Sequence, residues 1–428
     1  MPYISIVLAM IVMVLQFVAC TPSSQAPFPA TYLEELTIPQ LQLGYQQGRY
    51  TIKQVVADYI SRINAIDKRG PKLNSVIVVN PDALQIAEAL DREWQAGRFR
   101  GPMHGIPVII KDNIDTHDKM PNTAGSLALK NSLPLQDSYI VKKLRDAGAV
   151  IIAKANLSEW ANFRAETSSS GWSGVGGQTN NPYVLDRNPC GSSSGSAVAV
   201  SANLCMMAIG TETNGSIVCP SNNNGIVGLK PTVGLLSRSG IIPISFTQDT
   251  PGPMGRTVED VAICLGVLTG LDSTDTKTLA SRGHSHSDYS RFLRKDGVKG
   301  KRIGLVTDAL GFSVKVDTLI RAVAAHLVRQ GATVIEVESP QGHYEEASYQ
   351  VLLYEFKDGL NRYLRSLGAN APIRSLADLI AFNKTDSLEM RFFDQKILEA
   401  AEAKGGLDTG EYQDRKSTRL NSSHRIRS

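Results

Sequence analysis

The chain has few cysteines and histidines, the residues that most often build metal and redox sites. Five Cys, at positions 20, 190, 205, 219 and 264, and seven His occur among its 428 residues. No Cys-x-x-Cys pair and no short His/Cys cluster with metal-ligand spacing is present. The sequence therefore predicts no metal, and nothing in it implies a nucleotide or organic cofactor. Whether the last four cysteines are thiols or disulfides stays open.

An excess of one charge is also missing. The sequence has 45 Lys and Arg against 41 Asp and Glu, but five of the basic residues and one acid lie in residues 414–428. This segment has no hydrophobic period, helix cap or helix stop, and it back-translates into a widely used sequencing-library adaptor, so we interpret it as read-through. The remaining residues hold 40 basic and 40 acidic side chains. Net charge thus gives no reason to expect nucleic acid or anionic membrane as a partner.

One long apolar run is present, from residue 4 to residue 20, and it is short for a membrane span. The polar turn sequence that follows it is typical of an export signal. Phe17-Val-Ala-Cys20 resembles a bacterial lipobox. We predict a signal peptide over 1–19, lipidation of Cys20 as the first mature residue, a linker over 20–33, and a periplasmic or membrane-anchored lipoprotein. A cleaved signal without lipid and an uncleaved anchor are the alternatives.

Periodic segments alternate between helix and strand along the rest of the chain. Apolar residues recur at helical spacing behind Thr51, and buried-strand runs occupy 106–110 and 149–153 on either side of a helix near 137–146. Residues 302–306, 316–330 and 333–337 read as strand, helix and strand, a βαβ unit. This alternation predicts one α/β domain over 34–413, with a mixed central β-sheet flanked by helices.

Three polar features interrupt these segments. Lys111 closes a buried-type strand, Gly191–Ser196 is a serine cluster, and Gly210–Ser216 is a second glycine-serine turn. Taken singly, a lysine after an apolar run is most often a solvated strand end, and serine-glycine clusters are most often loops. Their joint occurrence at these spacings favours a catalytic site.

The flanks of these features resemble the amidase signature family. The matching pieces are Gly105-Ile-Pro-Val-Ile-Ile-Lys-Asp-Asn113, Gly191–Ser196, Gly210–Pro220 and Gly225-Ile-Val-Gly-Leu-Lys-Pro-Thr232. Bacterial peptide amidases are the most similar branch, through Asn156-Leu-Ser-Glu-Trp-Ala-Asn-Phe-Arg164 and Gly240-Ile-Ile-Pro-Ile-Ser-Phe-Thr-Gln-Asp249. Because family members usually continue further, the resemblance implies a domain that is incomplete at its C-terminus.

The resemblance assigns three catalytic roles: Lys111 is the base, Ser192 the bridging serine, in a cis peptide bond with Gly191, and Ser216 the nucleophile. A serine hydroxyl needs an adjacent base, and a lysine serves as that base only when burial lowers its pKa enough to keep it neutral. The apolar approach to Lys111 suits such burial. The oxyanion hole is expected from the backbone N–H groups of Thr213, Asn214, Gly215 and Ser216.

These residues predict a serine hydrolase that cleaves carboxamides through an acyl-enzyme, with the C-terminal amide of peptides as the substrate. Another small amide, or a non-catalytic binding lipoprotein, is the alternative. The sequence leaves the oligomeric state open, and an export signal disfavours a subunit of a tRNA amidotransferase. A G-x-S-x-G elbow on Ser193 lacks the strand it needs. His104 and His117 are expected to line a pocket or the surface and not to act as bases.

Overall fold

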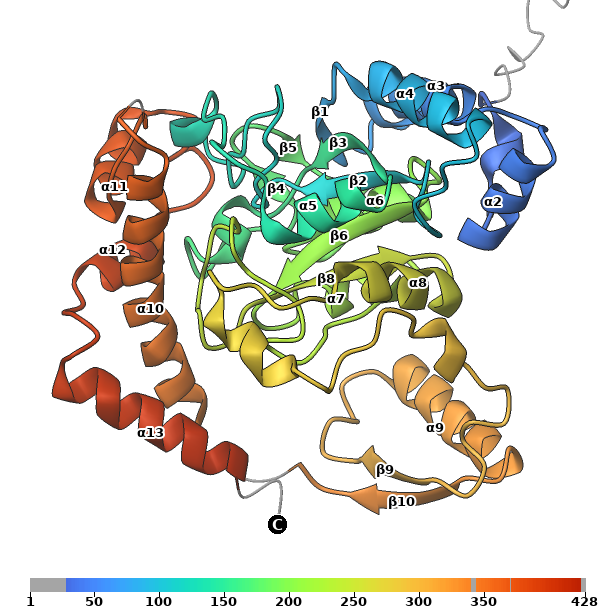
Figure 1. Cartoon of the computed structure of the whole chain (residues 1–428). Coiled ribbons are helices and arrows are strands. Elements are labelled where there is room, and N and C mark those ends of the chain that lie inside the picture. Colours follow the sequence, from blue (N-terminus) through green and yellow to red (C-terminus); the bar gives the residue numbers. More distant parts are fainter. Residues whose placement is uncertain (1–27, 340–343, 370, 425–428) are drawn as a thin grey trace, which may run out of the picture.

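The computed structural model describes residues 28–339, 344–369 and 371–424 (Figure 1). The predicted signal peptide and Cys20 lie outside these ranges. Within the described ranges, no helix is both long enough and apolar enough to cross a membrane.

A six-stranded mixed sheet forms the centre of the molecule, in the order β1-β3-β2-β6-β8-β7. Strands β3, β2 and β6 run parallel, while β1 and β8 pair antiparallel with the neighbours that flank them, and β7 is antiparallel to β8. Its strands are β1 (Val76–Val79), β2 (Pro107–Lys111), β3 (Val150–Ala155), β6 (Met207–Glu212), β7 (Val227–Gly228) and β8 (Thr250–Gly255). Strands β4 (Trp172–Ser173) and β5 (Gly177–Gln178) form a small hairpin beside it.

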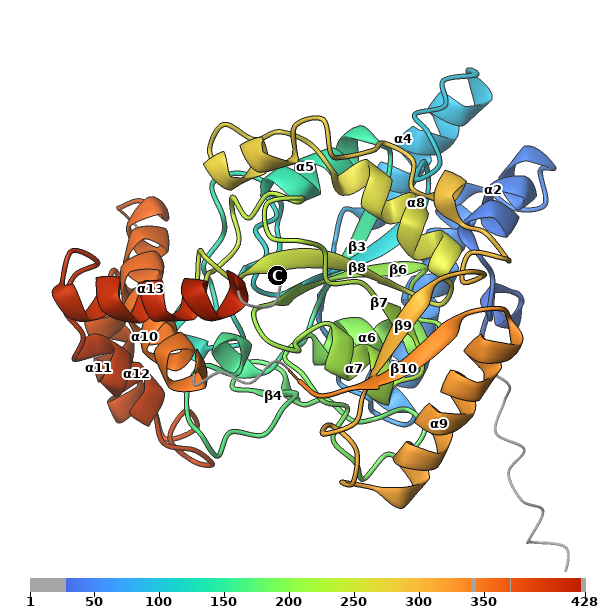
Figure 2. The same cartoon turned by 90° about the horizontal axis from the view of Figure 1, so that it is seen from below.

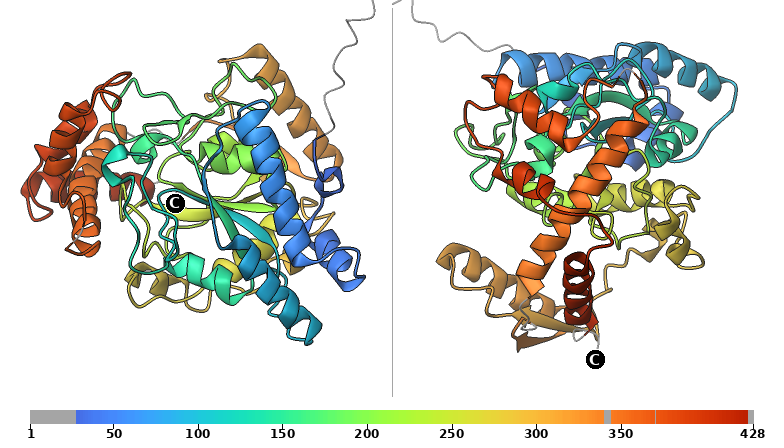
Figure 3. Two further views of the ribbon diagram at one scale, coloured as in Figure 1. Left: turned by 90° about the horizontal axis from the view of Figure 1, so that it is seen from above. Right: turned by 90° about the vertical axis from the view of Figure 1, so that its left-hand side faces the viewer.

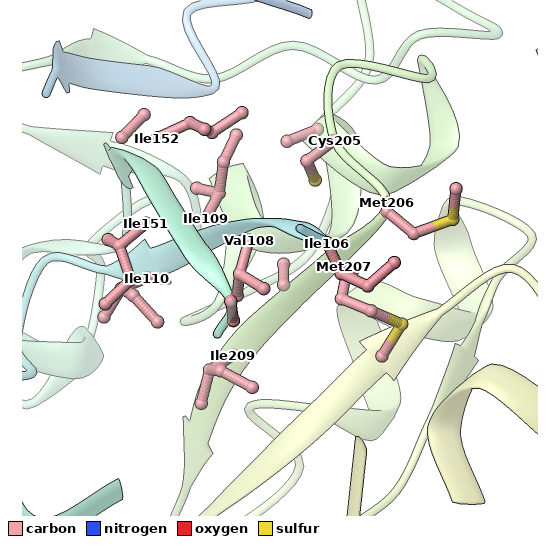
Figure 4. Close-up of a cluster of buried hydrophobic side chains, with 14 of the residues drawn as sticks. Ile106, Val108, Ile109, Ile110, Ile151, Ile152, Cys205, Met206, Met207 and Ile209 are labelled. Carbon is pink, nitrogen blue, oxygen red and sulfur yellow. The ribbon is translucent and has the colours of Figure 1, made fainter. Parts of the chain in front are cut away.

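The strands β2, β3 and β6 are buried along their whole length. Strands covered on both faces read as continuous apolar runs, which is why the runs at 106–110 and 149–153 were recognisable. Figure 4 shows apolar side chains of these strands, with Ile109, Ile151 and Met207 among those labelled. All three are inaccessible to solvent.

Helices cover both faces of this sheet. In Figure 2, α5 and α8 lie on one face, and α6 and α7 lie on the other. The predicted helix behind Thr51 is α3, and the Thr51 side chain caps it by accepting the N–H of Gln54. The helices of the body are α2 (Ile38–Gln46), α3 (Ile52–Arg62), α4 (Ala83–Gln95), α5 (Tyr139–Asp146), α6 (Ser194–Ser201), α7 (Val218–Asn223) and α8 (Val258–Leu268). A π-helical turn (Ile63–Arg69) and short 3₁₀ segments (Thr31–Leu33, Leu127–Leu129, Glu159–Asn162, Thr276–Ser281 and Ser290–Phe292) complete it.

Four further helices form a layer on one side of the body (Figures 1 and 3). They are α10 (Tyr344–Ser366), α11 (Leu376–Thr385), α12 (Lys396–Glu402) and α13 (Gly410–His424). Phe356 and Leu360 of α10 pack in a second apolar cluster that includes Trp160 of the body. The Tyr363 hydroxyl donates to Asp115 Oδ1 at 2.8 Å, so α10 is tied to the segment that follows β2.

The predicted βαβ unit is present as β9 (Arg302–Val306), α9 (Val314–Arg329) and β10 (Thr333–Val337). Its two parallel strands pair with each other and not with the central sheet. The fold class is therefore as predicted, an α/β domain with a mixed central sheet, but this unit stands beside the sheet (Figure 1).

Residues 414–424, the described part of the segment interpreted as read-through, are helical. They continue α13, a helix that is anchored upstream by buried Tyr412, whose hydroxyl donates to Glu355 Oε1 at 2.9 Å. Arg419 also donates to Thr247 Oγ1 at 2.8 Å. A helix started by a packed turn propagates into residues that carry little helical signal themselves. The interpretation of residues 414–428 as read-through stays a prediction.

Candidate active site

The site lies where the central parallel strands end. β2 and β6 are hydrogen-bonded parallel neighbours, so their carboxyl ends meet at one edge of the sheet. Lys111 is the last residue of β2, Thr211 and Glu212 close β6, and Ser216 follows in the next turn. The pairing of β2 with β6 thereby brings together residues that are far apart in sequence.

The Lys111 amine is completely buried and touches only neutral oxygens. Its Nζ lies 2.7 Å from Ser192 Oγ, and it donates to Thr211 Oγ1 at 2.9 Å and to the Thr211 carbonyl at 3.2 Å. Burial lowers the pKa of Lys111 to about 7, although the nearby carboxylates of Asp249 and Glu212 act in the opposite direction. Much of this lysine is therefore neutral at physiological pH.

The serine cluster brings Ser192 next to this amine. The Gly191–Ser192 peptide bond is cis, as the resemblance implies. The N–H of Ser193, at the head of α6, donates to the Ser216 carbonyl at 3.1 Å, so the cluster and the turn that carries Ser216 are joined directly. Both Ser192 and Ser216 line the same hollow. The structure thus gathers Lys111, Ser192 and Ser216 in one place.

The turn from Thr213 to Ser216 is held at both ends by carboxylates. Glu212 Oε2 accepts the N–H groups of Ile217 at 2.7 Å and Val218 at 3.0 Å. At the other end, the Thr213 hydroxyl donates to Asp249 Oδ1 at 2.6 Å. Burial raises the pKa of Asp249 to about 6. Because both ends of this short turn are held by hydrogen bonds, its backbone has little conformational freedom.

Between those ends the backbone donors are free. Within the described residues, the N–H groups of Asn214, Gly215 and Ser216 have no protein acceptor. Gly215 takes the left-handed conformation, with φ +82°, which turns the chain at this point without a side-chain clash. Successive unpaired amides beside a serine are suited to bind a developing oxyanion.

A narrow hollow lies beside these residues. Its walls combine polar groups of β2, β6 and the turn with apolar groups of the 241–244 segment; among them are Asn113, Thr211, Asp249, Ile241, Ile242 and Ile244. No group of three or more metal-ligating side chains occurs in the part of the chain that the structure describes.

The competing nucleophile and bases are placed elsewhere. Ser193 is fully buried, and its hydroxyl donates to the Thr211 carbonyl at 3.1 Å. No strand precedes it, as the sequence indicated. His117 is exposed on the surface. The expectation for His104 was wrong: it lies neither in the hollow nor on the surface but buried against the rings of Trp94 and Phe99.

A disulfide that the sequence left open joins the two serine segments. Cys190, two residues before Ser192, is bonded to Cys219, three residues after Ser216. Cys205 and Cys264 are buried free thiols. The bridge holds the flanks of the serine cluster and the nucleophile turn together.

Four polar residues of this site had no role in the sequence interpretation: Asn113, Thr211, Glu212 and Asp249. All four stand inside the segments that carried the resemblance, so their positions were visible. Most of their partners were not, because the contacts of Asn113, Thr211 and Asp249 cross between β2, β6 and the segment before β8, while Glu212 accepts from Ile217 nearby in sequence.

Comparisons with known proteins agree with this geometry. The model of the Amidase family matches residues 54–427. A probable amidase of Arabidopsis thaliana is 43% identical over 398 residues, which cover 90% of this chain and 75% of the relative. An amidase-related protein of Schizosaccharomyces pombe is 42% identical, and the match covers 82% of this chain but only 63% of that protein.

A solved structure of an amidase also matches this chain. The native peptide amidase of Stenotrophomonas maltophilia superposes with a TM-score of 0.87 at 51% identity, over 91% of this chain and 79% of that one. The chain therefore belongs to the amidase family, whose enzymes hydrolyse amides.

Proposed function

We propose that this protein hydrolyses the C-terminal carboxamide of peptides through an acyl-enzyme on Ser216, with Ser192 and Lys111 as the proton path. The observation that carries the proposal is a fully buried lysine with a pKa near 7, 2.7 Å from a serine that shares a hollow with a second serine. Burial disfavours the charged form of a lysine. A lysine with only a structural role would therefore not stabilise the fold by being buried in this way.

The lysine is arranged to accept a proton from Ser192. A neutral amine has two N–H groups and one lone pair, and Thr211 offers two acceptors, its Oγ1 and its carbonyl. With both N–H groups donated to Thr211, the lone pair is left for the Ser192 hydroxyl. Ser192 can then take the proton of Ser216 as the latter attacks the carbonyl carbon.

In the acylation step, a bond forms between Ser216 Oγ and the substrate carbon, and the Ser216 proton passes through Ser192 to Lys111 Nζ. The carbonyl oxygen becomes an oxyanion that accepts from the free N–H groups of the 214–216 turn. Collapse of this intermediate breaks the C–N bond. The proton returns through Ser192 to the leaving nitrogen, which departs as ammonia, and water then releases the acid by the same route.

Peptide amides are supported by the 51% identity with the Stenotrophomonas maltophilia peptide amidase and by the apolar wall of Ile241, Ile242 and Ile244. Such a wall suits the side chain of an amino-acid amide better than a charged group.

The test is release of ammonia from N-acetyl-leucinamide by the wild type and Ser216→Ala. The variant should lose at least about three orders of magnitude in kcat, because the nucleophile has no substitute. Ser201→Ala is the matched control: Ser201 ends α6, donates to the Asn224 carbonyl and does not line the hollow. Normal turnover by a folded Ser216→Ala protein would refute the mechanism. Absence of turnover in the wild type, for this and other amides, would favour a binding lipoprotein.

We also propose that the protein is exported and carries its lipid on Cys20. The half-buried Cys190–Cys219 disulfide supports an oxidising compartment, since such bonds are rare in the cytosol. Membrane fractionation of the wild type and Cys20→Ser tests this, and equal cytosolic recovery of both would exclude it.

A further inference from the structure

Among the described residues, two buried polar atoms near the candidate site have no hydrogen-bond partner. Asn113 donates its Nδ2 to Thr211 Oγ1 at 3.0 Å, but its Oδ1 is unpaired, and so is the indole Nε1 of Trp160. Each of these residues is only 2% exposed. Buried polar atoms are nearly always paired, so each unpaired one calls for an explanation. One is an acceptor and the other a donor.

Both residues line one space. A second, narrow hollow is lined by Asn113, Trp160 and Phe356, and it shares Asn113, Ala161, Ile242 and Ile244 with the hollow that holds Ser192 and Ser216. The shared walls make the two hollows neighbours. The described residues include other buried polar atoms without a partner. Of these atoms, only those of Asn113 and Trp160 belong to residues that line the two hollows.

The backbone that presents Trp160 is strained. Trp160, Ala161 and Asn162 take φ values of 50°, 53° and 70°, three successive residues with side chains in the left-handed region. This conformation is unfavourable for such residues and persists where the surroundings hold it, often at binding sites. Here the Trp160 N–H donates to the Ala124 carbonyl at 2.9 Å, and the ring packs with the cluster around Phe356.

We propose that Asn113 and Trp160 form a subsite that recognises the peptide unit preceding the carboxamide that is cleaved. The N–H of that unit would donate to Asn113 Oδ1, and its carbonyl would accept from Trp160 Nε1. A secondary amide offers one donor and one acceptor, which is the complement of the two unpaired atoms. This inference rests on the proposed function and adds to it the reason why an amide of a peptide, and not any carboxamide, is selected.

A simple aliphatic amide would leave both atoms unpaired. Its apolar group could still occupy the hollow, but the donor and the acceptor, which are already buried without a partner, would gain no hydrogen bond from it. Discrimination should therefore appear between two substrates that differ only in the peptide unit. N-acetyl-leucinamide contains it, and isocaproamide is the same molecule with hydrogen in place of the acetylamino group.

The experiment measures kcat/KM for both amides and takes their ratio. Trp160→Phe keeps a ring and removes the N–H, and Asn113→Ala removes the acceptor. Each should lower the ratio of kcat/KM for N-acetyl-leucinamide over isocaproamide by about five- to tenfold, as the loss of one buried hydrogen bond implies. Trp172→Phe is the matched control, because Trp172 lines a different hollow with Phe392 and Phe393, and its ratio should stay at the wild-type value.

Other outcomes overturn the subsite. If Trp160→Phe and Asn113→Ala slow both substrates equally, the residues act on folding or on Lys111 and not on the peptide unit, while the amidase function stands. A wild-type ratio near one has the same meaning and needs no variant. If the wild type hydrolyses neither amide, the proposed function fails, and the subsite fails with it.

Discussion

The activity of the enzyme should depend on pH through the protonation of Lys111. Its pKa of about 7, against 10.5 for a free lysine, means that about half of the amine is neutral at pH 7, where about one free lysine in three thousand would be. The gain in base concentration is on the order of a thousandfold, equivalent to about 4 kcal/mol. Activity should therefore fall about tenfold per pH unit below that midpoint and level off above it.

The assay is ammonia release from N-acetyl-leucinamide between pH 5 and 9, with kcat/KM taken from initial rates, since this quantity reports the groups of the free enzyme. Circular dichroism at each pH separates titration from unfolding. The cause of the shift can be tested in the same assay. Burial lowers the pKa of Lys111, whereas the charge of Asp249, which titrates near pH 6, raises it. Asp249→Asn should therefore move the midpoint to lower pH.

The control is Asp186→Asn, because the Asp186 side chain is exposed and the midpoint should not move. A midpoint above about pH 9 would show that Lys111 behaves as a solvated lysine. A profile that is flat down to the onset of acid unfolding would exclude it as the base. A shift to higher pH in Asp249→Asn would contradict the electrostatic reasoning but not the role of the lysine.

Two predictions concern stability. The Cys190–Cys219 bridge closes a loop with a sequence separation of 29 residues, so replacing both cysteines by alanine should lower the free energy of unfolding by about 3–4 kcal/mol in urea. Reductant should reproduce this loss in the wild type but not in the double variant, and an equal response of both would refute the assignment. Arg164 lies buried between Glu159 and Glu389, and Glu389 Oε2 is 2.8 Å from its Nη1. Arg164→Met should cost about 3–5 kcal/mol, because two carboxylates lose their cation. A cost no larger than that of exposed Arg187→Met would contradict this.

Much of the body was predictable because its elements are covered on both faces. The runs 106–110 and 149–153 are continuous and apolar, and the helix behind Thr51 has both a period and a cap. By contrast, β8 was missed. Its sequence, Thr-Pro-Gly-Pro-Met-Gly, contains two prolines, which disfavour a strand interior, yet it pairs with β6 over six residues. Its pairing is decided by its neighbours and not by its own propensity.

For the site, the sequence by itself singled out Lys111, Ser192 and Ser216 as the candidate residues, because their local motifs are specific enough to carry the resemblance. Only the tertiary structure decided what surrounds them: the Thr211 oxygens on the lysine, the carboxylates of Glu212 and Asp249 at the ends of the nucleophile turn, the partner of Cys190, and the unpaired atoms of Asn113 and Trp160. The Thr211 oxygens, the Asp249 carboxylate and the Cys190 bridge are contacts between segments distant in sequence, whereas Glu212 accepts from Ile217 within its own segment. Local patterns report periodicity and turns, whereas burial and partnership depend on which strand ends meet at the edge of the sheet.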